Sequence, residues 1–297
     1  MAEAGWLWVL FTLIAAAAQT VRNATQRELT AQLGTVGATH VRFLFGFPFA
    51  LVFLAGVTIA LHAWPPSPPP IFWPWAALGA LAQIAATALM LAAMSDRSFV
   101  VVYAYIKIEP VQAALFGLVF LGDTVSIGMA AAILIATAGV VLTALKPGAA
   151  MDLRATWLGL AAGAMFALSA VGYRGAILSL ATSSYVIAAT FTLTIGLLIQ
   201  AGLLSLYLWL RDPTVLRAIL RAWQPSLFAG FMGALASQFW FLAFALAAAA
   251  SVRTLALVEV LFAQAISRFV FKQATTAREG MGIVLIVIGV VLLLWVH

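Results

Sequence analysis

Long apolar runs follow one another along the whole chain, and few charged residues interrupt them. Only 8% of the 297 residues are charged, and 65% are hydrophobic. A soluble domain carries about 25% charged residues, so a soluble fold of this length could not cover its surface. The bilayer is therefore the expected solvent. Soluble enzymes, secreted scaffolds and disordered proteins are excluded.

The number of spans follows from the length of the chain. A helical span needs about 20 apolar residues, and a connection adds a handful more, so we expect ten spans. These segments are apolar on every face, whereas barrel strands alternate over about ten residues, and the sequence therefore predicts an all-α polytopic membrane protein. The predicted spans are residues 5–22, 34–61, 74–94, 98–121, 126–145, 156–178, 184–210, 225–249, 252–271 and 277–296.

Several kinds of chemistry are excluded by what the sequence lacks. Cysteine is absent, which excludes disulfides, thiolate metal sites and cysteine nucleophiles. The three histidines show no metal-ligand spacing. The net charge is +6, but the basic residues are scattered, so we expect no nucleic-acid partner. No nucleophile–base cluster is visible, and we expect neither an enzyme nor a cofactor.

The sequence repeats itself at a shift of 150 residues. This shift places Trp73 on Trp223, Glu109 on Glu259, and the GVVL run at 139–142 on the same run at 289–292. We therefore predict two repeats, residues 1–146 and 153–297. Because each half holds five spans, an odd number, the second enters the bilayer from the opposite face. Inverted repeats around a central cavity are typical of secondary transporters, which bind substrate near the midplane.

Three motifs in the first half resemble a known family. They are IEPV at 108–111, FLGD at 120–123 and GVVL at 139–142, and together they resemble the EamA-domain signature of the drug/metabolite transporter superfamily. The second half matches more loosely, because VEV at 258–260 lacks the proline and FKQ at 271–273 replaces the turn. The resemblance implies ten helices, with spans 1–4 and 6–9 around the cavity and spans 5 and 10 outside it. Members of the superfamily include bacterial amino-acid exporters and carriers of nucleotide sugars and triose phosphates.

Two carboxylates lie well inside predicted spans, Glu109 and Glu259. An ionisable group at bilayer depth usually faces protein or a wet cavity. If transport is coupled to protons, these two residues are the expected carriers. The alternative is structural, because Pro110 interrupts the backbone ladder beside Glu109 and leaves polar groups that need partners.

Other polar and aromatic side chains lie inside the spans. On span four, Tyr105, Glu109 and Gln112 share one face, and Tyr103 and Lys107 share the opposite face. Lys107 and Glu109 are two residues apart and cannot pair locally, so each needs a partner on another helix or access to water. The predicted cavity residues are Gln19, Asn23, His40, Arg42, Gln83, Tyr103, Tyr105, Glu109, Gln112, Tyr173, Gln238, Trp240 and Glu259.

Each basic candidate also has a plainer interpretation. His40 can be a hydrogen-bonded core residue instead of a proton relay. Arg22 and Arg174 lie at span ends, where they can extend to the headgroups, and Arg42 fits either role. The connector at 211–221 contains Arg211, Arg217 and Arg221, and we expect it to form a short interfacial helix.

The balance of inward charge selects a substrate class. Against the two acids stand five basic residues that can point inward. These are Arg22, Arg42, Lys107, Arg174 and Arg253. A basic surplus favours a carboxylate or phosphate, and the aromatic residues can stack on a ring. We predict a secondary transporter that exports amino acids or related carboxylates by alternating access. The alternatives are a nucleotide-sugar or phosphorylated-metabolite carrier, a multidrug exporter of cationic compounds, and a membrane scaffold.

The setting of the protein follows from the same reasoning. We expect a multi-pass monomer in a bacterial-type inner membrane, with the bilayer, a small-molecule substrate and, where coupling exists, protons as its partners. The orientation stays open. The basic connectors follow odd-numbered spans, and the positive-inside rule therefore places both termini outside. The family pattern places both termini in the cytoplasm.

Overall fold

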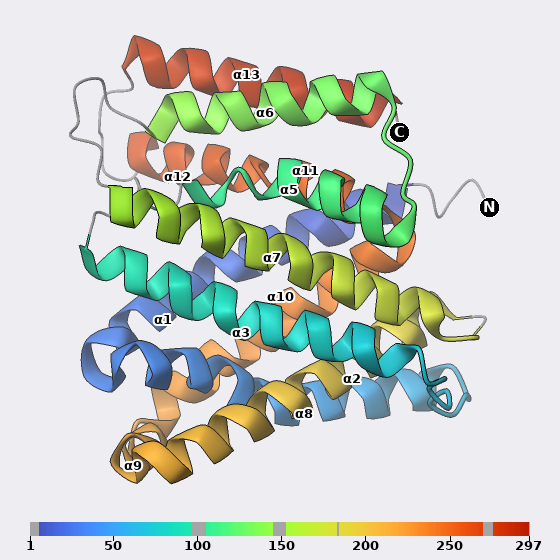
Figure 1. Ribbon diagram of the computed structural model, residues 1–297, viewed down its shortest axis with the longest axis vertical. Helices are drawn as coiled ribbons and strands as arrows, with labels where there is room; N and C mark the ends of the chain where they lie inside the picture. The colour runs from blue at the N-terminus through green and yellow to red at the C-terminus, as the bar shows by residue number, and fades with distance from the viewer. Residues whose placement is uncertain are drawn as a thin grey trace. The chain divides into compact units, whose positions relative to one another are not determined.

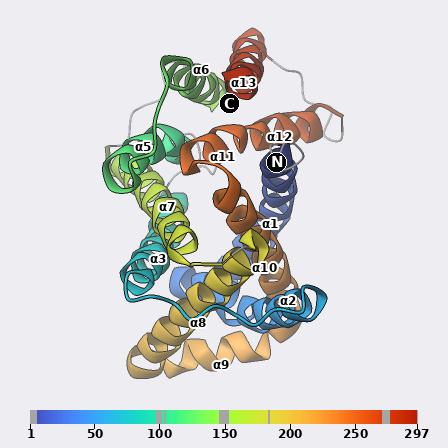
Figure 2. The same ribbon diagram turned by 90° about the vertical axis from the view of Figure 1, so that its right-hand side faces the viewer.

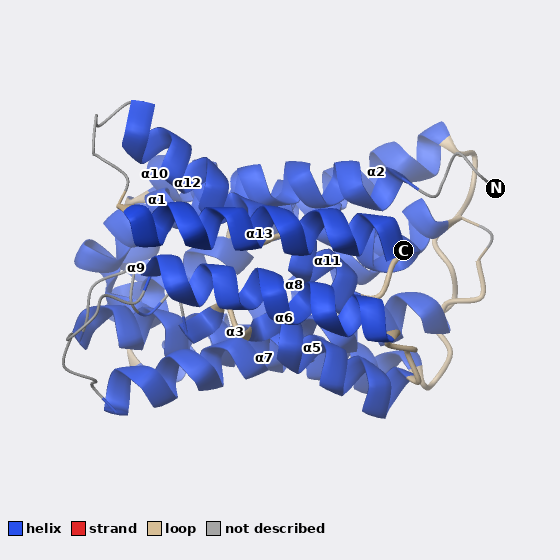
Figure 3. Cartoon of the chain, turned by 90° about the horizontal axis from the view of Figure 1, so that it is seen from above, coloured by secondary structure: helices blue, strands red, loops and turns tan. Residues whose placement is uncertain are grey.

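The structure, a computed structural model, describes residues 6–96, 102, 105–144, 153–182, 184–269 and 276–296. These residues form helices joined by loops and include no strand (Figure 3). Among them are three shorter apolar helices and six that are long and apolar enough to cross a membrane. This is the pattern of a polytopic membrane protein, as predicted. The six long segments are Leu29–Ala60, Phe72–Ala93, Leu153–Ser179, Tyr185–Arg211, Trp223–Leu246 and Ala277–Val296.

The helices, labelled in Figure 1, form two compact units. Unit 1 comprises Met1–Ala88 and Gly172–Ala247, and unit 2 comprises Leu89–Val171 and Ala248–His297. Each unit combines helices from both halves of the sequence, so the packing units are not the halves 1–146 and 153–297. The repeats stay a prediction about the sequence.

Unit 1 holds α1, α2, α8, α9 and α10, with the first part of α3 and the end of α7. The bounds of these helices are α1 (Leu7–Leu44), α2 (Gly46–Ala60), α3 (Phe72–Asp96), α7 (Leu153–Ser179), α8 (Tyr185–Arg211), α9 (Pro213–Arg221) and α10 (Trp223–Leu246). The connector at 211–221 contains the predicted short helix, α9. It lies beside α8 (Figures 1 and 2).

Unit 2 holds the remaining helices, with the end of α3 and the first part of α7. Its elements are α5 (Glu109–Phe116), the π-helical turn η2 (Gly117–Leu121), α6 (Ile127–Ala144), α11 (Ala249–Leu255), α12 (Val258–Phe269) and α13 (Ala277–Val296).

The first predicted connection is wrong. We expected span one to end near residue 22 and span two to begin at residue 34, but α1 continues as a helix through the interval to Leu44. Residues 23–33 contain no glycine or proline, so nothing in them stops a helix. The direction changes only at Gly34, whose φ of 68° suits a residue without a side chain. Gln26 Nε2 donates to Ala38 O at 2.9 Å across this kink.

Two predicted spans are broken helices. Span four was expected to be continuous over 98–121, but the described part breaks at Lys107 and Ile108, and α5 begins at Glu109. The reason is Pro110, which has no N–H to donate to the preceding turn. Span nine was expected over 252–271, and it breaks between α11 and α12, at residues 256 and 257. The second break contains no proline.

α6 and α13 pack against each other through glycines (Figures 1 and 2). A Cβ on Gly139 would lie 2.8 Å from Ile286 N, and a Cβ on Gly289 would lie 2.6 Å from Ala136 N. Partner numbers fall along α13 as they rise along α6, so the helices are antiparallel. The shift of 150 residues that relates Gly139 to Gly289 also relates Ala136 to Ile286. These glycines belong to the repeated GVVL runs, and their absent side chains permit the close approach.

We predict that Gly139→Ala lowers the stability of the protein. Its methyl group would lie 2.7 Å from the backbone oxygen of Gly282, which cannot move aside, and overpacking of this kind costs about 1–3 kcal/mol. Gly280→Ala is the matched control, because no atom lies within 4 Å of its Cβ position and alanine favours a helix. Thermal unfolding of the detergent-purified variants measures both. An equal or higher midpoint for Gly139→Ala would contradict the packing.

Candidate functional site

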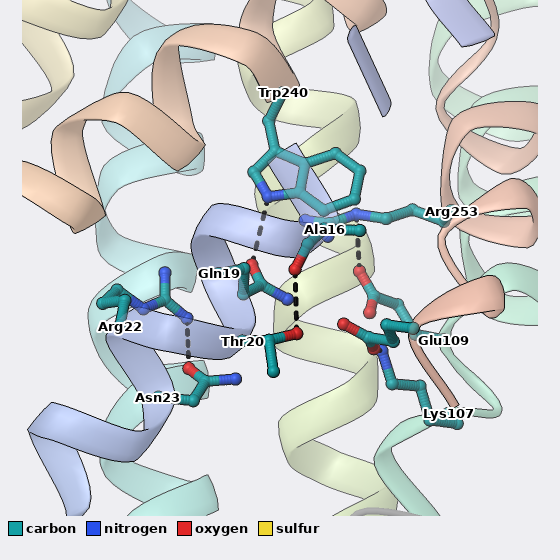
Figure 4. Close-up of polar contacts among 10 residues, drawn as sticks. Ala16, Gln19, Thr20, Arg22, Asn23, Lys107, Glu109, Trp240 and Arg253 are labelled. Carbon is teal, nitrogen blue, oxygen red and sulfur yellow. Dashed lines mark hydrogen bonds and ion pairs between the residues drawn. The ribbon is translucent and has the colours of Figure 1, made fainter. Parts of the chain in front are cut away.

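Four buried charged residues of unit 2 form two ion pairs (Figure 4). Lys107 Nζ binds Glu259 Oε1, and Arg253 Nε lies 2.8 Å from Glu109 Oε1. None of the four side chains is more than 9% exposed. Each pair joins a base from one half of the sequence to the acid from the other half, so the pairs are crossed.

The local sequence places these acids at the starts of helices. Glu109 is the first residue of α5, and Glu259 lies in the first turn of α12. Each therefore follows the helix break described above, and the breaks occupy equivalent positions in the two halves. The N-terminus of a helix carries partial positive charge, which stabilises a carboxylate. Each acid thus has two sources of compensation, a helix N-terminus and a basic side chain.

The crossed pairs resolve the expectation for span four. Lys107 and Glu109 each bind a residue of span nine, which is one of the two outcomes expected, a partner on another helix or access to water. They also change the charge balance. Glu259 and Glu109 compensate the charges of Lys107 and Arg253, and the other three of the five basic residues counted above are Arg22, Arg42 and Arg174.

Arg22 and Arg42 meet at one glycine of unit 1. Both belong to α1, and each is 3% exposed. A Cβ on Gly233 of α10 would lie 3.2 Å from Arg42 Cγ and 3.4 Å from Arg22 Cδ, so this glycine makes room for both stems. The stems of two basic side chains thereby pass through one buried region of unit 1. Arg22 is not extended to a headgroup, contrary to the plainer interpretation of a residue at a span end.

Both arginines donate to neutral partners. Arg22 Nη2 donates to Asn23 Oδ1 at 2.6 Å (Figure 4). Arg42 Nη1 donates to Thr87 Oγ1 at 3.4 Å. These contacts fix the direction of each side chain.

Arg174 has a different role. Its Nη1 donates to Phe244 O at 2.6 Å and to Ala247 O at 2.7 Å. These carbonyls lie at the C-terminal end of α10, where helix carbonyls lack intrahelical partners and attract cations. Arg174 therefore caps α10, which the sequence did not indicate.

Several other predicted residues of unit 1 bind one another or their neighbours. Trp240 Nε1 donates to Gln19 Oε1 at 3.1 Å, which joins α10 to α1 (Figure 4). Trp240 also stacks on Phe244, with ring centroids 6.2 Å apart. His40 is fully buried, and its Nε2 lies 3.0 Å from Ser205 Oγ. This is the environment expected of the hydrogen-bonded core alternative.

The two predicted glutamines of α3 and α10 take part in hydrogen bonds to α8. Gln83 Oε1 accepts from Gln200 Nε2 at 2.8 Å, and Gln238 Nε2 donates to Thr190 Oγ1 at 2.8 Å. Gln200, Thr190 and Ser205 were not among the predicted residues. Gln200 could have been found, because an amide inside a long apolar span requires a partner. Threonine and serine give no such signal.

The predicted tyrosines and Gln112 lie in tight packing. Tyr173 is 1% exposed, and its ring packs against Gly79, Gly196 and Phe241. In unit 2, Tyr105 packs on Gly159, and Gln112 Nε2 donates to Leu160 O at 3.3 Å. Tyr103 lies outside the described residues.

The predicted residues therefore divide between the units. Those of unit 1 are Gln19, Asn23, His40, Arg42, Gln83, Tyr173, Gln238 and Trp240, and those of unit 2 are Tyr105, Glu109, Gln112 and Glu259. Within the described part of the chain, no group of three or more His, Asp or Glu side chains could hold a metal ion.

Comparison with known proteins identifies the fold and no family. No protein-family model matches the sequence, and no curated protein matches it significantly. A protein of known crystal structure is similar, with a TM-score of 0.71 and 14% sequence identity over 99% of each chain. At this identity the likeness concerns the fold alone.

We predict that Glu259→Gln destabilises the protein strongly, because it leaves the Lys107 ammonium buried without its carboxylate. Breaking a buried pair in this way costs about 3–5 kcal/mol, whereas replacing both partners costs far less. The double variant Lys107→Met/Glu259→Gln should therefore unfold at a higher temperature than the single variant. Thermal unfolding in detergent measures the difference. A double variant no more stable than the single one would contradict the pairing.

Proposed function

We propose that the chain is a secondary transporter that exports amino acids or related small carboxylates by alternating access. In this proposal ten spans form two inverted five-helix repeats in a bacterial-type inner membrane. The polytopic helical character and the likeness of the fold to a solved structure are compatible with it. The specific support comes from the paired features of the two halves and from the buried arginines.

Two features of unit 2 support the inverted repeats. α6 and α13 are the fifth and tenth predicted spans, and they pack antiparallel through contacts that the 150-residue shift interchanges. The breaks before Glu109 and Glu259 match under the same shift to within one residue. Interrupted helices at corresponding positions of two halves are typical of transporters, which build their sites there.

The observation that carries the substrate class is the convergence of Arg22 and Arg42 at Gly233. Guanidinium groups bind carboxylates bidentately, and a buried position strengthens such a contact because water does not compete. Basic side chains favour a carboxylate over a hydrophobic cation as the substrate. Trp240, hydrogen-bonded to Gln19 in the same unit, is the aromatic residue assigned in this proposal to the substrate side chain.

The crossed ion pairs support the structural alternative for the two acids. We propose that Glu109 and Glu259 hold α5 and the region of α11 and α12 together through Arg253 and Lys107. A carboxylate that carries protons must be able to lose its charge partner. Here each acid is held by a basic residue of the other half of the sequence.

A flux assay tests the substrate class. Proteoliposomes should release labelled amino acids, and Arg42→Gln should raise the KM for them by about tenfold to a hundredfold, which corresponds to one lost charge-assisted hydrogen bond. Arg154→Gln is the control, because it removes the same charge from the exposed start of α7. Cationic dye efflux without movement of any amino acid would defeat the proposal, and nucleotide-sugar flux would favour the alternative carrier.

A second assay separates the structural role from proton coupling. Lys107→Met/Glu259→Gln removes the acid together with its base, so the structural role predicts that the double variant still transports and responds to an imposed pH gradient as the unaltered protein does. Initial rates in proteoliposomes with and without the gradient measure this. Retained transport with a lost gradient response would make Glu259 a proton carrier.

A further inference from the structure

We propose that the outward face of α9 binds the phosphate headgroup of an anionic phospholipid, through Arg211, Arg217 and Arg221. This inference concerns the lipid, and it is independent of the transported substrate. All three arginines are exposed. They lie within 11 residues of one another, at the end of α8 and along α9.

The packing of α9 determines which of its faces is free. Val215 and Ile219 are one helical turn apart, and both approach the Cβ position of Gly37 on α1, at 3.0 and 4.0 Å. Ile219 is fully buried. Arg217 and Arg221 are also one turn apart, and Arg217 is two residues from either apolar residue, on the opposite face of the helix. The apolar face of α9 therefore packs on α1, and Arg217 and Arg221 project from the opposite face.

The single acid in this segment does not neutralise the face. Asp212 is the N-cap of α9, and its Oδ1 accepts from the Thr214 hydroxyl, from Thr214 N at 3.2 Å and from Val215 N at 3.4 Å. The hydrogen bond from the Thr214 side chain lowers the pKa of Asp212, and the two backbone hydrogen bonds add to this effect. The negative charge of Asp212 is thus bound by the N-terminus of α9. The other charged side chains of the segment are the three arginines.

Neighbouring side chains place this face at headgroup depth. Trp209 near the end of α8 is 64% exposed, and Trp223 at the start of α10 is 52% exposed. Exposed tryptophans mark the membrane interface. Leu220, 58% exposed, accompanies the arginines on α9. A basic face with adjoining apolar and indole groups fits a lipid, which presents an anionic phosphate above acyl chains, better than a free anion.

Competition between lipids tests the proposal on the full-length protein. The purified protein is equilibrated in mixed micelles with equal amounts of phosphatidylglycerol and phosphatidylcholine, and the retained lipids are counted by native mass spectrometry. The unaltered protein should retain phosphatidylglycerol preferentially. The double variant Arg217→Gln/Arg221→Gln should lose about fivefold of this preference for each arginine removed.

Two further variants keep the test specific. Arg154→Gln removes an exposed charge from another helix and should leave the preference within about twofold of the original. Arg217→Lys/Arg221→Lys keeps both charges and should retain most of the preference, even if the glutamine variant folds poorly. Equal retention of the two lipids by the unaltered protein would overturn the proposal. So would an Arg154→Gln effect as large as that of the double variant, because net charge would then explain the binding.

Discussion

A charge placed at bilayer depth costs about 2.5–3.5 kcal/mol even on the mildest scale, unless the protein compensates it. Unit 2 compensates four such charges with one another. The cluster of Lys107, Glu109, Arg253 and Glu259 is neutral, and each acid also meets the positive end of a helix. The helix breaks are part of this solution. They place each carboxylate at the start of a new helix, where the helix dipole favours negative charge.

Close packing in a membrane needs small residues, because lipid provides no hydrophobic force between helices. Glycines permit close helix packing at several places in this chain. Gly139 and Gly289 bring α6 and α13 together, while Gly159 and Gly163 receive Tyr105 and Gln112 from the region of α5. The spacing of Gly159 and Gly163 is a dimerisation pattern in many membrane helices, but here the contact lies within the chain.

The sequence predicted the features that depend on composition and depth. It predicted a helical membrane protein, the partners required by Lys107 and Glu109, and the helix after Arg211. It could not predict which base meets which acid, because that choice depends on how α5 and α11 pack. It also failed at residues 23–33, where polarity indicated a connection but helix propensity prevailed. Tyr173 was assigned to the cavity as a polar aromatic residue, yet glycines on α3 and α8 enclose its ring. These glycines are far from Tyr173 in the sequence, so the contact could not be predicted without the fold.

The arginines show why residue type alone does not determine a role in this setting. Arg174 meets the carbonyl end of α10 and serves as a cap. Arg253 meets a carboxylate and completes a neutral cluster. The stems of Arg22 and Arg42 both pass Gly233 of α10, so two basic side chains enter one buried region of unit 1. In the proposed function these two side chains bind the carboxylate of the substrate. Their common approach to α10 depends on Gly233 having no side chain.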